Sequence, residues 1–264
     1  MRADQLLVQR GLAPSRSAAQ RLIAQGAVRW RGSAGWAVPR KAGEELPECC
    51  ELQVTDDAEL RFVSRGGLKL DGALAHCGLD VDGRCVLDLG QSTGGFTDVL
   101  LQRGAARVHA VDVGYGQLHP RLRADPRVTV LERTNARTLE ELPFPPQLVV
   151  CDVSFISVRT ALPPVLRLAA PGWQAVVLVK PQFEAGRADV GKGGVVRDPD
   201  VRRRVVREVA EAALEWGASA AGVVDSGLPG PKGNRELVLH LLQSDHPTLP
   251  DDLDERIAQA VTAG

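Results

Sequence analysis

The stretch CVLDLGQSTGGFTDVLLQRGAARVHAVD, residues 85–112, decides the fold. It begins with an apolar, strand-like run at residues 85–89, passes through a turn of small residues and continues as a helical segment. A second strand-like run, at residues 107–113, follows. Strand, glycine-rich turn, helix and strand in this order predict the start of an open parallel sheet that binds a ligand at the carboxyl ends of its strands.

The alternation of strands and helices continues toward the C-terminus. It predicts five further strands, at residues 128–132, 147–153, 174–180, 219–225 and 236–242, with helices around 202–216 and 251–263. Only residues 226–235 join the last two strands, which is too short for a right-handed helical crossover. The predicted fold class is therefore α/β: a Rossmann-like sheet of seven strands, mostly parallel, with the last strand antiparallel.

Residues 1–60 predict a separate, small α+β domain. Two short helices are expected within residues 2–26, divided at Gly11, with Ser15 as the N-cap of the second helix and Gly26 after it. Strands are expected at residues 27–30 and 51–54. Residues 61–63 are interpreted as a linker and residues 64–264 as the large domain.

The small domain is basic although the whole chain has a net charge of −1. Against the single acid Asp4, residues 1–41 contain the cations Arg2, Arg10, Arg16, Arg21, Arg29, Arg31, Arg40 and Lys41. A basic end on a nearly neutral protein predicts a polyanionic partner that binds to that end.

Composition excludes several classes of protein. The five cysteines are an odd number without a C-x-x-C spacing, which indicates reduced thiols and no zinc site. No apolar signal segment and no run of about 18 apolar residues occurs, so a cytoplasmic protein without membrane spans is expected.

The turn after residue 89 favours a nucleoside cofactor of a particular kind. It lacks the G-x-G-x-x-G pattern of dinucleotide sites and the Lys-Ser/Thr of ATP-binding loops. Asp112, at the end of the second strand, is placed to accept hydrogen bonds from both hydroxyls of a ribose, while Asp88 is expected to hold the loop or to reach a charged amino-acid tail. Together with the antiparallel last strand, this pattern points to S-adenosylmethionine.

Several phrases of the sequence carry a resemblance to a known family. They are SRGGLKL (64–70), STGGFT (92–97), DVGYGQL (112–118), ERTNAR (132–137), DVSFIS (152–157), VKPQFE (179–184) and GPKGNRE (230–236). On these phrases residues 64–242 resemble the FtsJ-type 2′-O-ribose methyltransferases. The whole chain resembles the TlyA family of haemolysin A-like proteins, in which an RNA-binding domain of the ribosomal-protein S-four type precedes that catalytic domain.

The resemblance implies methylation of a ribose 2′-hydroxyl, on cytidine, in 16S or 23S ribosomal RNA, with ribosomal subunits as partners, no metal, and a monomer or weak dimer. It implies a catalytic tetrad of Lys69, Asp152, Lys180 and Glu236. Lys180 is expected to be central, accepting the proton or polarising the hydroxyl. The implied cofactor-binding residues are Asp88, Gly90, Ser92, Thr93, Gly94, Asp112 and Asn135. The expected RNA-binding residues are Arg2, Arg10, Arg16, Arg21 and Lys41.

Some details depart from the family or remain open. Residues 28–32, VRWRG, replace a usual valine-asparagine-glycine turn, and Gln91, expected to face solvent or cofactor, stands where alanine is common. Phe183 is expected as a pocket wall and residues 186–194 as a mobile loop beside the site. One alternative is a non-catalytic RNA-binding assembly factor, which retention of the tetrad disfavours. Another is a secreted pore-former, which the missing signal and membrane segments disfavour.

Overall fold

The computed structural model describes residues 1–33, 35–57, 60–230 and 232–263. Predicted features that fall on Ala34, Ala58, Glu59, Pro231 and Gly264 lie outside the described residues; they include parts of the expected domains and one position of the phrase at 230–236. The chain divides into two compact units, Met1–Arg65 and Gly66–Gly264.

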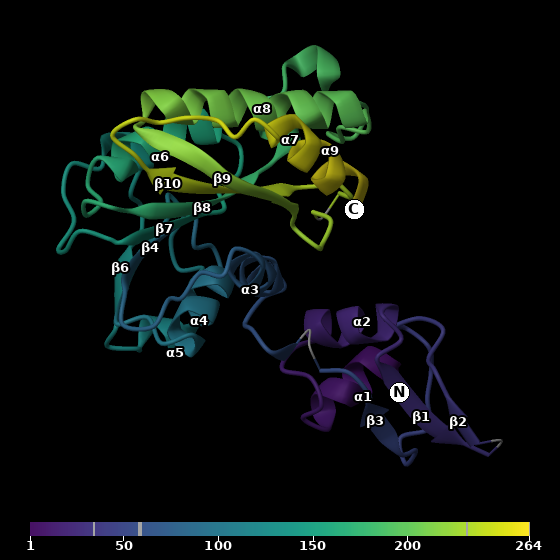
Figure 1. Ribbon diagram of the computed structural model, residues 1–264. Coiled ribbons are helices and arrows are strands. Elements are labelled where there is room, and N and C mark those ends of the chain that lie inside the picture. The colour runs from purple at the N-terminus through teal and green to yellow at the C-terminus, as the bar shows by residue number, and fades with distance from the viewer. Residues whose placement is uncertain (34, 58–59, 231, 264) are drawn as a thin grey trace. The chain divides into compact units, whose positions relative to one another are not determined.

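The large unit is built on a seven-stranded sheet in the order β6-β5-β4-β7-β8-β10-β9 (Figure 1). Its strands are β4 (Cys85–Leu89), β5 (Arg107–Val111), β6 (Val128–Leu131), β7 (Leu148–Cys151), β8 (Gln174–Val179), β9 (Ala218–Asp225) and β10 (Leu237–Gln243). Neighbours from β6 to β8 pair in parallel, whereas β10 is antiparallel to both β8 and β9. The predicted fold class, including the antiparallel last strand, is confirmed.

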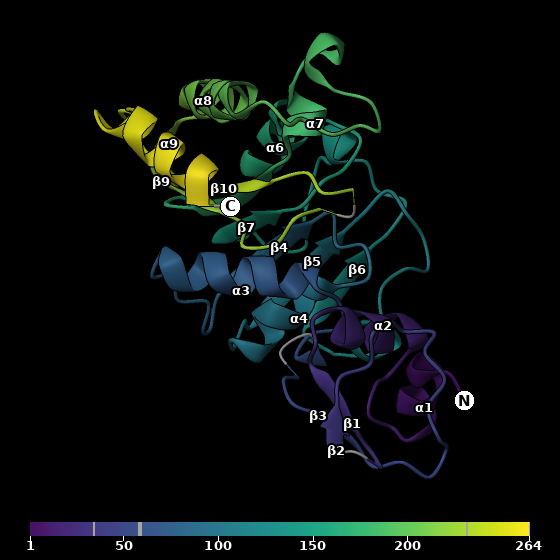
Figure 2. The ribbon, with the colours of Figure 1, turned by 90° about the vertical axis from the view of Figure 1, so that its right-hand side faces the viewer.

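Helices cover both faces of this sheet, as Figure 2 shows. On one face lie α3 (Gly66–His76) and α4 (Gly95–Gln102); on the other lie α6 (Val158–Leu166), α8 (Pro199–Glu215) and α9 (Leu253–Ala263). The short helix α5 (Pro120–Arg123) precedes β6. Because both faces are covered, central strands are apolar throughout: β7 is entirely buried and β8 is buried from its second residue on.

Four of the predicted strands end earlier in the structure than in the sequence pattern, β6 and β8 by one residue and β5 and β7 by two. β5 ends at Val111 and β7 at Cys151, so Asp112 and Asp152 are the first residues beyond the sheet. Both polar side chains therefore lie at the carboxyl edge of the parallel strands, where ligands bind in such sheets.

The small unit contains α1 (Ala3–Gln9), α2 (Arg16–Ala24) and a three-stranded antiparallel sheet with the order β2-β1-β3, formed by β1 (Val28–Gly32), β2 (Gly35–Ala37) and β3 (Leu52–Val54). Ser15 caps α2 as predicted, since its Oγ accepts the Ala18 N–H at 3.2 Å. The atypical residues 28–32 form the central strand. β2 was not predicted, because its three residues are all exposed and show no alternation of buried and exposed positions.

Candidate active site

Two cavities lie at the carboxyl edge of the parallel strands. The first cavity, of about 350 Å³, is lined by residues that follow β4, β5, β6 and β7. The second cavity, of about 330 Å³, is lined by residues that follow β7 and β8 and by the segment that leads into β10. Ser154 and Phe155 line both cavities. The two cavities are therefore neighbours that share one wall.

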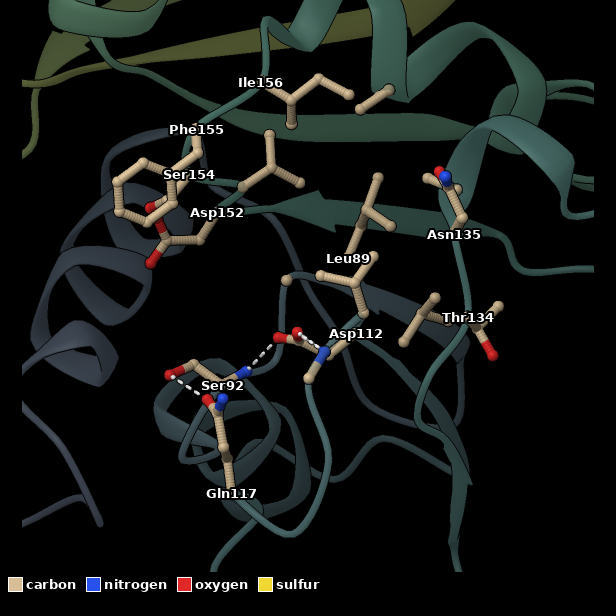
Figure 3. Close-up of a pocket in the computed structure, with 17 residues that line it drawn as sticks. Leu89, Ser92, Asp112, Gln117, Thr134, Asn135, Asp152, Ser154, Phe155 and Ile156 are labelled. Atoms are coloured by element: carbon tan, nitrogen blue, oxygen red, sulfur yellow. Dashed lines mark hydrogen bonds between the residues drawn. The ribbon is translucent and has the colours of Figure 1, made fainter.

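Asp112 lines the first cavity and binds two of the turns that surround it (Figure 3). Its Oδ2 accepts the Ser92 N–H at 2.9 Å, and its Oδ1 accepts the Gly114 N–H at 2.7 Å. One carboxylate thus fixes the turn after β4 and the turn after β5 to each other. Each oxygen retains a further lone pair that a ligand hydroxyl can use.

Gly90 brings the turn after β4 close to the end of β7. Its φ is +88°, and a Cβ at this position would lie 2.7 Å from the Asp152 carbonyl oxygen. A side chain is therefore excluded both by backbone conformation and by space. Asn135, across the cavity from Asp152 in Figure 3, is the N-cap of the 3₁₀ turn η2 (Ala136–Thr138), and its Oδ1 accepts the Arg137 N–H at 3.0 Å.

The structure does not bring all the sequence-predicted cofactor residues to the cavity surface. Gly90, Ser92, Asp112 and Asn135 line the first cavity, but Asp88, Thr93 and Gly94 do not. Asp88 is fully buried, and its Oδ2 accepts the Thr97 hydroxyl at 2.6 Å, which joins β4 to α4. The arrangement corresponds to the loop-holding alternative for Asp88.

The environment of Gln91 differs from the expectation that its side chain faces solvent or cofactor. The side chain is buried and does not line the first cavity. Neither its Oε1 nor its Nε2 has a hydrogen-bond partner within the described part of the chain. The expectation was wrong because the turn folds the side chain inward, a direction that the sequence pattern does not encode.

Burial gives Asp88 a pH-dependent effect on stability. Desolvation raises the pKa of Asp88 from its usual 3.8 to about 7, against the opposing hydrogen bond from Thr97. The folded state therefore binds more protons at Asp88 than the unfolded state does. For this reason the free energy of unfolding decreases as the pH rises from about 4 to about 7. We expect the Asp88→Asn variant to lose less stability than the wild type across this window in urea unfolding. Equal pH dependence of the two proteins would contradict the assignment.

The four predicted tetrad residues form two ion pairs. The Lys180 Nζ lies 2.7 Å from the Asp152 Oδ1 and donates to the Ser154 Oγ at 2.8 Å. The Lys69 ammonium, on α3, donates to the Glu236 carboxylate, just before β10. Both lysines are only 7% exposed.

The two pairs form one charged cluster. Burial raises the pKa of Asp152, while the ammonium groups of Lys180 and, more weakly, Lys69 oppose the rise and the Glu236 carboxylate adds to it. Asp152 lines the first cavity, whereas Lys180 and Glu236 line the second. The cluster therefore lies at the boundary between the two cavities.

Phe155 is a feature of the site that sequence reasoning missed. Its side chain is 91% exposed, it lines both cavities, and its φ of +66° is unusual for a residue with a side chain. The Phe183 ring, which lines the second cavity as expected, lies 5.2 Å from it between centroids. A large aromatic residue four positions after the end of a buried strand was the available signal.

The loop at residues 186–194 lies beside the second cavity, as predicted, through Val190 and Gly194. Asn234 is buried and joins this loop to the segment before β10. Its Nδ2 donates to the Gly194 carbonyl at 2.8 Å, and its Oδ1 accepts the Val196 N–H at 2.9 Å. Mobility of the loop stays a prediction.

Some predicted RNA-binding cations of the small unit also stabilise that unit. Arg2 donates two hydrogen bonds, of 3.0 and 2.9 Å, to the buried Asp4 carboxylate, which Arg16 and Gln20 also contact. These contacts hold the pKa of Asp4 well below its usual range, and the hydrogen bonds from Arg2 have the largest effect.

Arg10 is also used internally, donating to the Cys50 carbonyl at 2.8 Å and to the Glu48 carbonyl. The side chains of Arg2 and Arg16 are 41% and 54% exposed, and Lys41 is exposed. The sequence did not anticipate the internal role of these arginines, although their outer surfaces stay accessible to a partner.

Comparison with known proteins agrees with this architecture. Residues 62–242 match the FtsJ-like methyltransferase family, and residues 1–29 match the S4 domain.

None of the helices in the described residues combines the length and the apolar character that a membrane span requires.

Two curated relatives and one solved structure match most of the chain. A Mycobacterium tuberculosis protein named 16S/23S rRNA (cytidine-2′-O)-methyltransferase TlyA is 49% identical over 100% of this chain and 98% of its own. Hemolysin A of Brachyspira hyodysenteriae is 37% identical over 92% of this chain and 100% of its own. The structure of a Streptococcus thermophilus protein, provisionally named a hemolysin, is 40% identical, with a TM-score of 0.76 over 99% of this chain and 96% of that one. With both domains matched in order and 49% identity over the whole chain, this chain belongs to the TlyA family of FtsJ-like methyltransferases with an N-terminal S4 domain.

Proposed function

We propose that this protein transfers a methyl group to the 2′-hydroxyl of a ribose, that of a cytidine, in 16S or 23S ribosomal RNA. The observation that carries the proposal is the Lys180–Asp152 pair beside the wall shared by the two cavities. A methyl donor in the first cavity and a ribose in the second would meet at this pair. The printed name of the M. tuberculosis relative supports the choice of nucleotide and RNA.

The methyl donor is S-adenosylmethionine, which when bound supplies an activated methyl group on a sulfonium centre. The residues of the first cavity fit this molecule. Asp112 can accept the ribose hydroxyls, and the missing side chain at Gly90 leaves the backbone open to close approach. Asn135 provides an amide for the base. Asp88, Thr93 and Gly94 act by shaping the turn and the start of α4.

In the second cavity, Lys180 orients the ribose hydroxyl. As a neutral amine it takes up the hydroxyl proton while the methyl is transferred and becomes the ammonium; if it is already an ammonium, it polarises the hydroxyl by donating a hydrogen bond to its oxygen, and the proton leaves to water. Asp152 and Ser154 fix the Lys180 ammonium, since both lie within 2.8 Å of its Nζ. Lys69 and Glu236 form the second ion pair, so the two ammonium groups of the cluster are matched by two carboxylates. Alignment of a weak nucleophile with an activated methyl can contribute about 7–11 kcal/mol to the lowering of a barrier.

The small unit binds the RNA through the exposed parts of its cations, Arg2, Arg10, Arg16, Arg21 and Lys41. Guanidinium groups suit phosphate contacts that recognise folded RNA by shape. Ribosomal subunits in the cytoplasm are the proposed partners, for a protein that acts as a monomer or weak dimer without a metal. The name of the M. tuberculosis relative favours both subunits as substrates.

Tritium transfer from labelled S-adenosylmethionine to unmethylated small and large subunits, and to naked RNA, tests the proposal. We expect labelled 2′-O-methylcytidine after nuclease digestion. RNA binding without any label in subunits or naked RNA would contradict it and would support the assembly-factor alternative. Label on a base instead of a ribose would also contradict it.

A variant of Asp112 tests the cofactor assignment. Hydrogen bonds to a charged group contribute about 1.5–3 kcal/mol each, so we expect Asp112→Ala to weaken S-adenosylmethionine binding by at least about 10- to 150-fold, which is the loss of one such bond. Isothermal titration calorimetry measures this effect. Asp125→Asn, which removes a carboxylate that pairs with Arg127 and does not line the first cavity, is the matched control and should bind normally. Unchanged binding by the Asp112 variant would rule out the assigned position.

A further inference from the structure

We propose that Glu184 is a positioning residue for methyl transfer, which fixes the segment after β7 that contains Asp152, Ser154 and Phe155. This inference rests on the function proposed above. Glu184 ends α7 (Pro181–Glu184), the short helix that starts directly after Lys180. Its side chain is 1% exposed, and it lines neither cavity, so it acts through other residues and not by touching a substrate.

The Glu184 carboxylate binds the first turn of α6. Its Oε2 accepts the Ser157 hydroxyl at 2.6 Å, and its Oε1 accepts the Val158 N–H at 2.7 Å. Arg159 lies beside it, with its Nε 3.4 Å from Oε2 and its Nη2 donating to the Glu184 carbonyl at 3.2 Å. Ser157 is itself the N-cap of α6 and accepts the Arg159 N–H at 3.1 Å. A buried carboxylate at a helix N-terminus accepts hydrogen bonds from N–H groups that the helix leaves unpaired. Its negative charge also interacts favourably with the positive end of the helix dipole.

The segment that this contact fixes is short and strained. It runs from the end of β7 at Cys151 to the start of α6 at Val158. Within it Phe155 has a φ of +66°, a conformation that costs free energy for a residue with a side chain and persists only where the surroundings impose it. β7 holds one end of the segment in the sheet, and Glu184 holds the other.

A second link joins the same two segments near the reacting groups. Lys180, at the start of α7, contacts Asp152 at 2.7 Å and Ser154 at 2.8 Å. The segments after β7 and β8 are therefore tied at both ends of α7, with the contact between the rings of Phe155 and Phe183 in between. Loss of Glu184 would free one end of this arrangement without removing any atom from either cavity. A displacement of about 1 Å at an aligned site can lower a rate by about 10²-fold.

Steady-state methyl transfer by the full chain, with ribosomal subunits as substrate, tests this role. We expect Glu184→Ala to lower kcat by about 10- to 100-fold while the KM for S-adenosylmethionine changes by less than about twofold. Glu184→Gln keeps an acceptor for the Val158 N–H and should recover kcat to within about fivefold of wild type. Ser157→Ala should fall between these two, and combining it with Glu184→Ala should lower kcat no further, because the two residues act as a unit.

Glu208→Gln is the matched control. Glu208, on α8, lies 3.5 Å from the Nη1 of the same Arg159 and should leave kcat unchanged. Rates are expressed per folded molecule, counted by S-adenosylmethionine titration. Wild-type kcat in Glu184→Ala, or in Ser157→Ala should the former not fold, would overturn the positioning role. Absence of transfer by the wild type would instead contradict the proposed function, and the positioning role would fall with it.

Discussion

Replacement of Lys180 by methionine is expected to lower the rate of methyl transfer by about 10²–10⁴-fold, the range that a positioned acid or base contributes. Methionine keeps most of the length of the side chain but removes the ammonium that contacts Asp152 and Ser154. Because Lys180 lines the second cavity and not the first, the affinity for S-adenosylmethionine should change little. Single-turnover transfer to ribosomal subunits, together with calorimetric titration of the cofactor, measures both quantities.

Two further variants make the interpretation of Lys180→Met specific. Asp152→Asn keeps the ammonium but removes the charge that fixes it, so a smaller loss of rate is expected than for Lys180→Met. Arg103→Met removes another ion-paired cation, bound to Asp71 at 2.7 Å and outside both cavities, and should leave the rate unchanged. A Lys180→Met protein that transferred methyl groups at the wild-type rate would exclude a chemical role for this lysine.

The meeting of Asp152 and Lys180 could be predicted from the sequence. Each directly follows an apolar run that is recognisable as a buried strand, and β7 and β8 are parallel neighbours. Parallel neighbours end at the same edge of a sheet, so residues that follow them meet without any knowledge of side-chain packing. The same reasoning placed Asp112 at this edge.

Contacts that depend on how side chains turn could not be predicted in this way. Local patterns identify strands and helices but do not show that Asp88, within β4, pairs with Thr97, or that the side chain of Gln91 folds inward in the turn after β4. The inward pairing of Arg2 with Asp4 likewise arises from the packing of α1 against its neighbours. The Glu184 contact with Ser157 joins the end of α7 to the N-cap of α6, two segments whose positions are set by the finished sheet. Lys69 and Glu236 were matched by resemblance, and 167 positions separate them along the chain.

The Lys69–Glu236 pair is the second place where a large effect is expected, this time on stability. Both side chains are buried, at 8% and 3% exposure, so removing one partner leaves an uncompensated charge away from water. We expect Lys69→Met and Glu236→Met each to lower the free energy of unfolding by about 3–5 kcal/mol. The double variant should recover most of this loss, because replacing a whole buried pair by apolar groups of similar size is often close to neutral.

Methyl transfer should separate the structural role of this pair from its chemical role. If the pair serves only folding, the double variant recovers activity together with stability. We expect it to recover stability alone, because Glu236 lines the second cavity and the charges of both residues act on Asp152. Native-state hydrogen exchange of the β8 and β10 amides reports the stability of the sheet beside the pair, and the tritium assay reports the activity. Wild-type transfer by the double variant would remove Lys69 and Glu236 from the catalytic group and leave Lys180 and Asp152 as its only charged members.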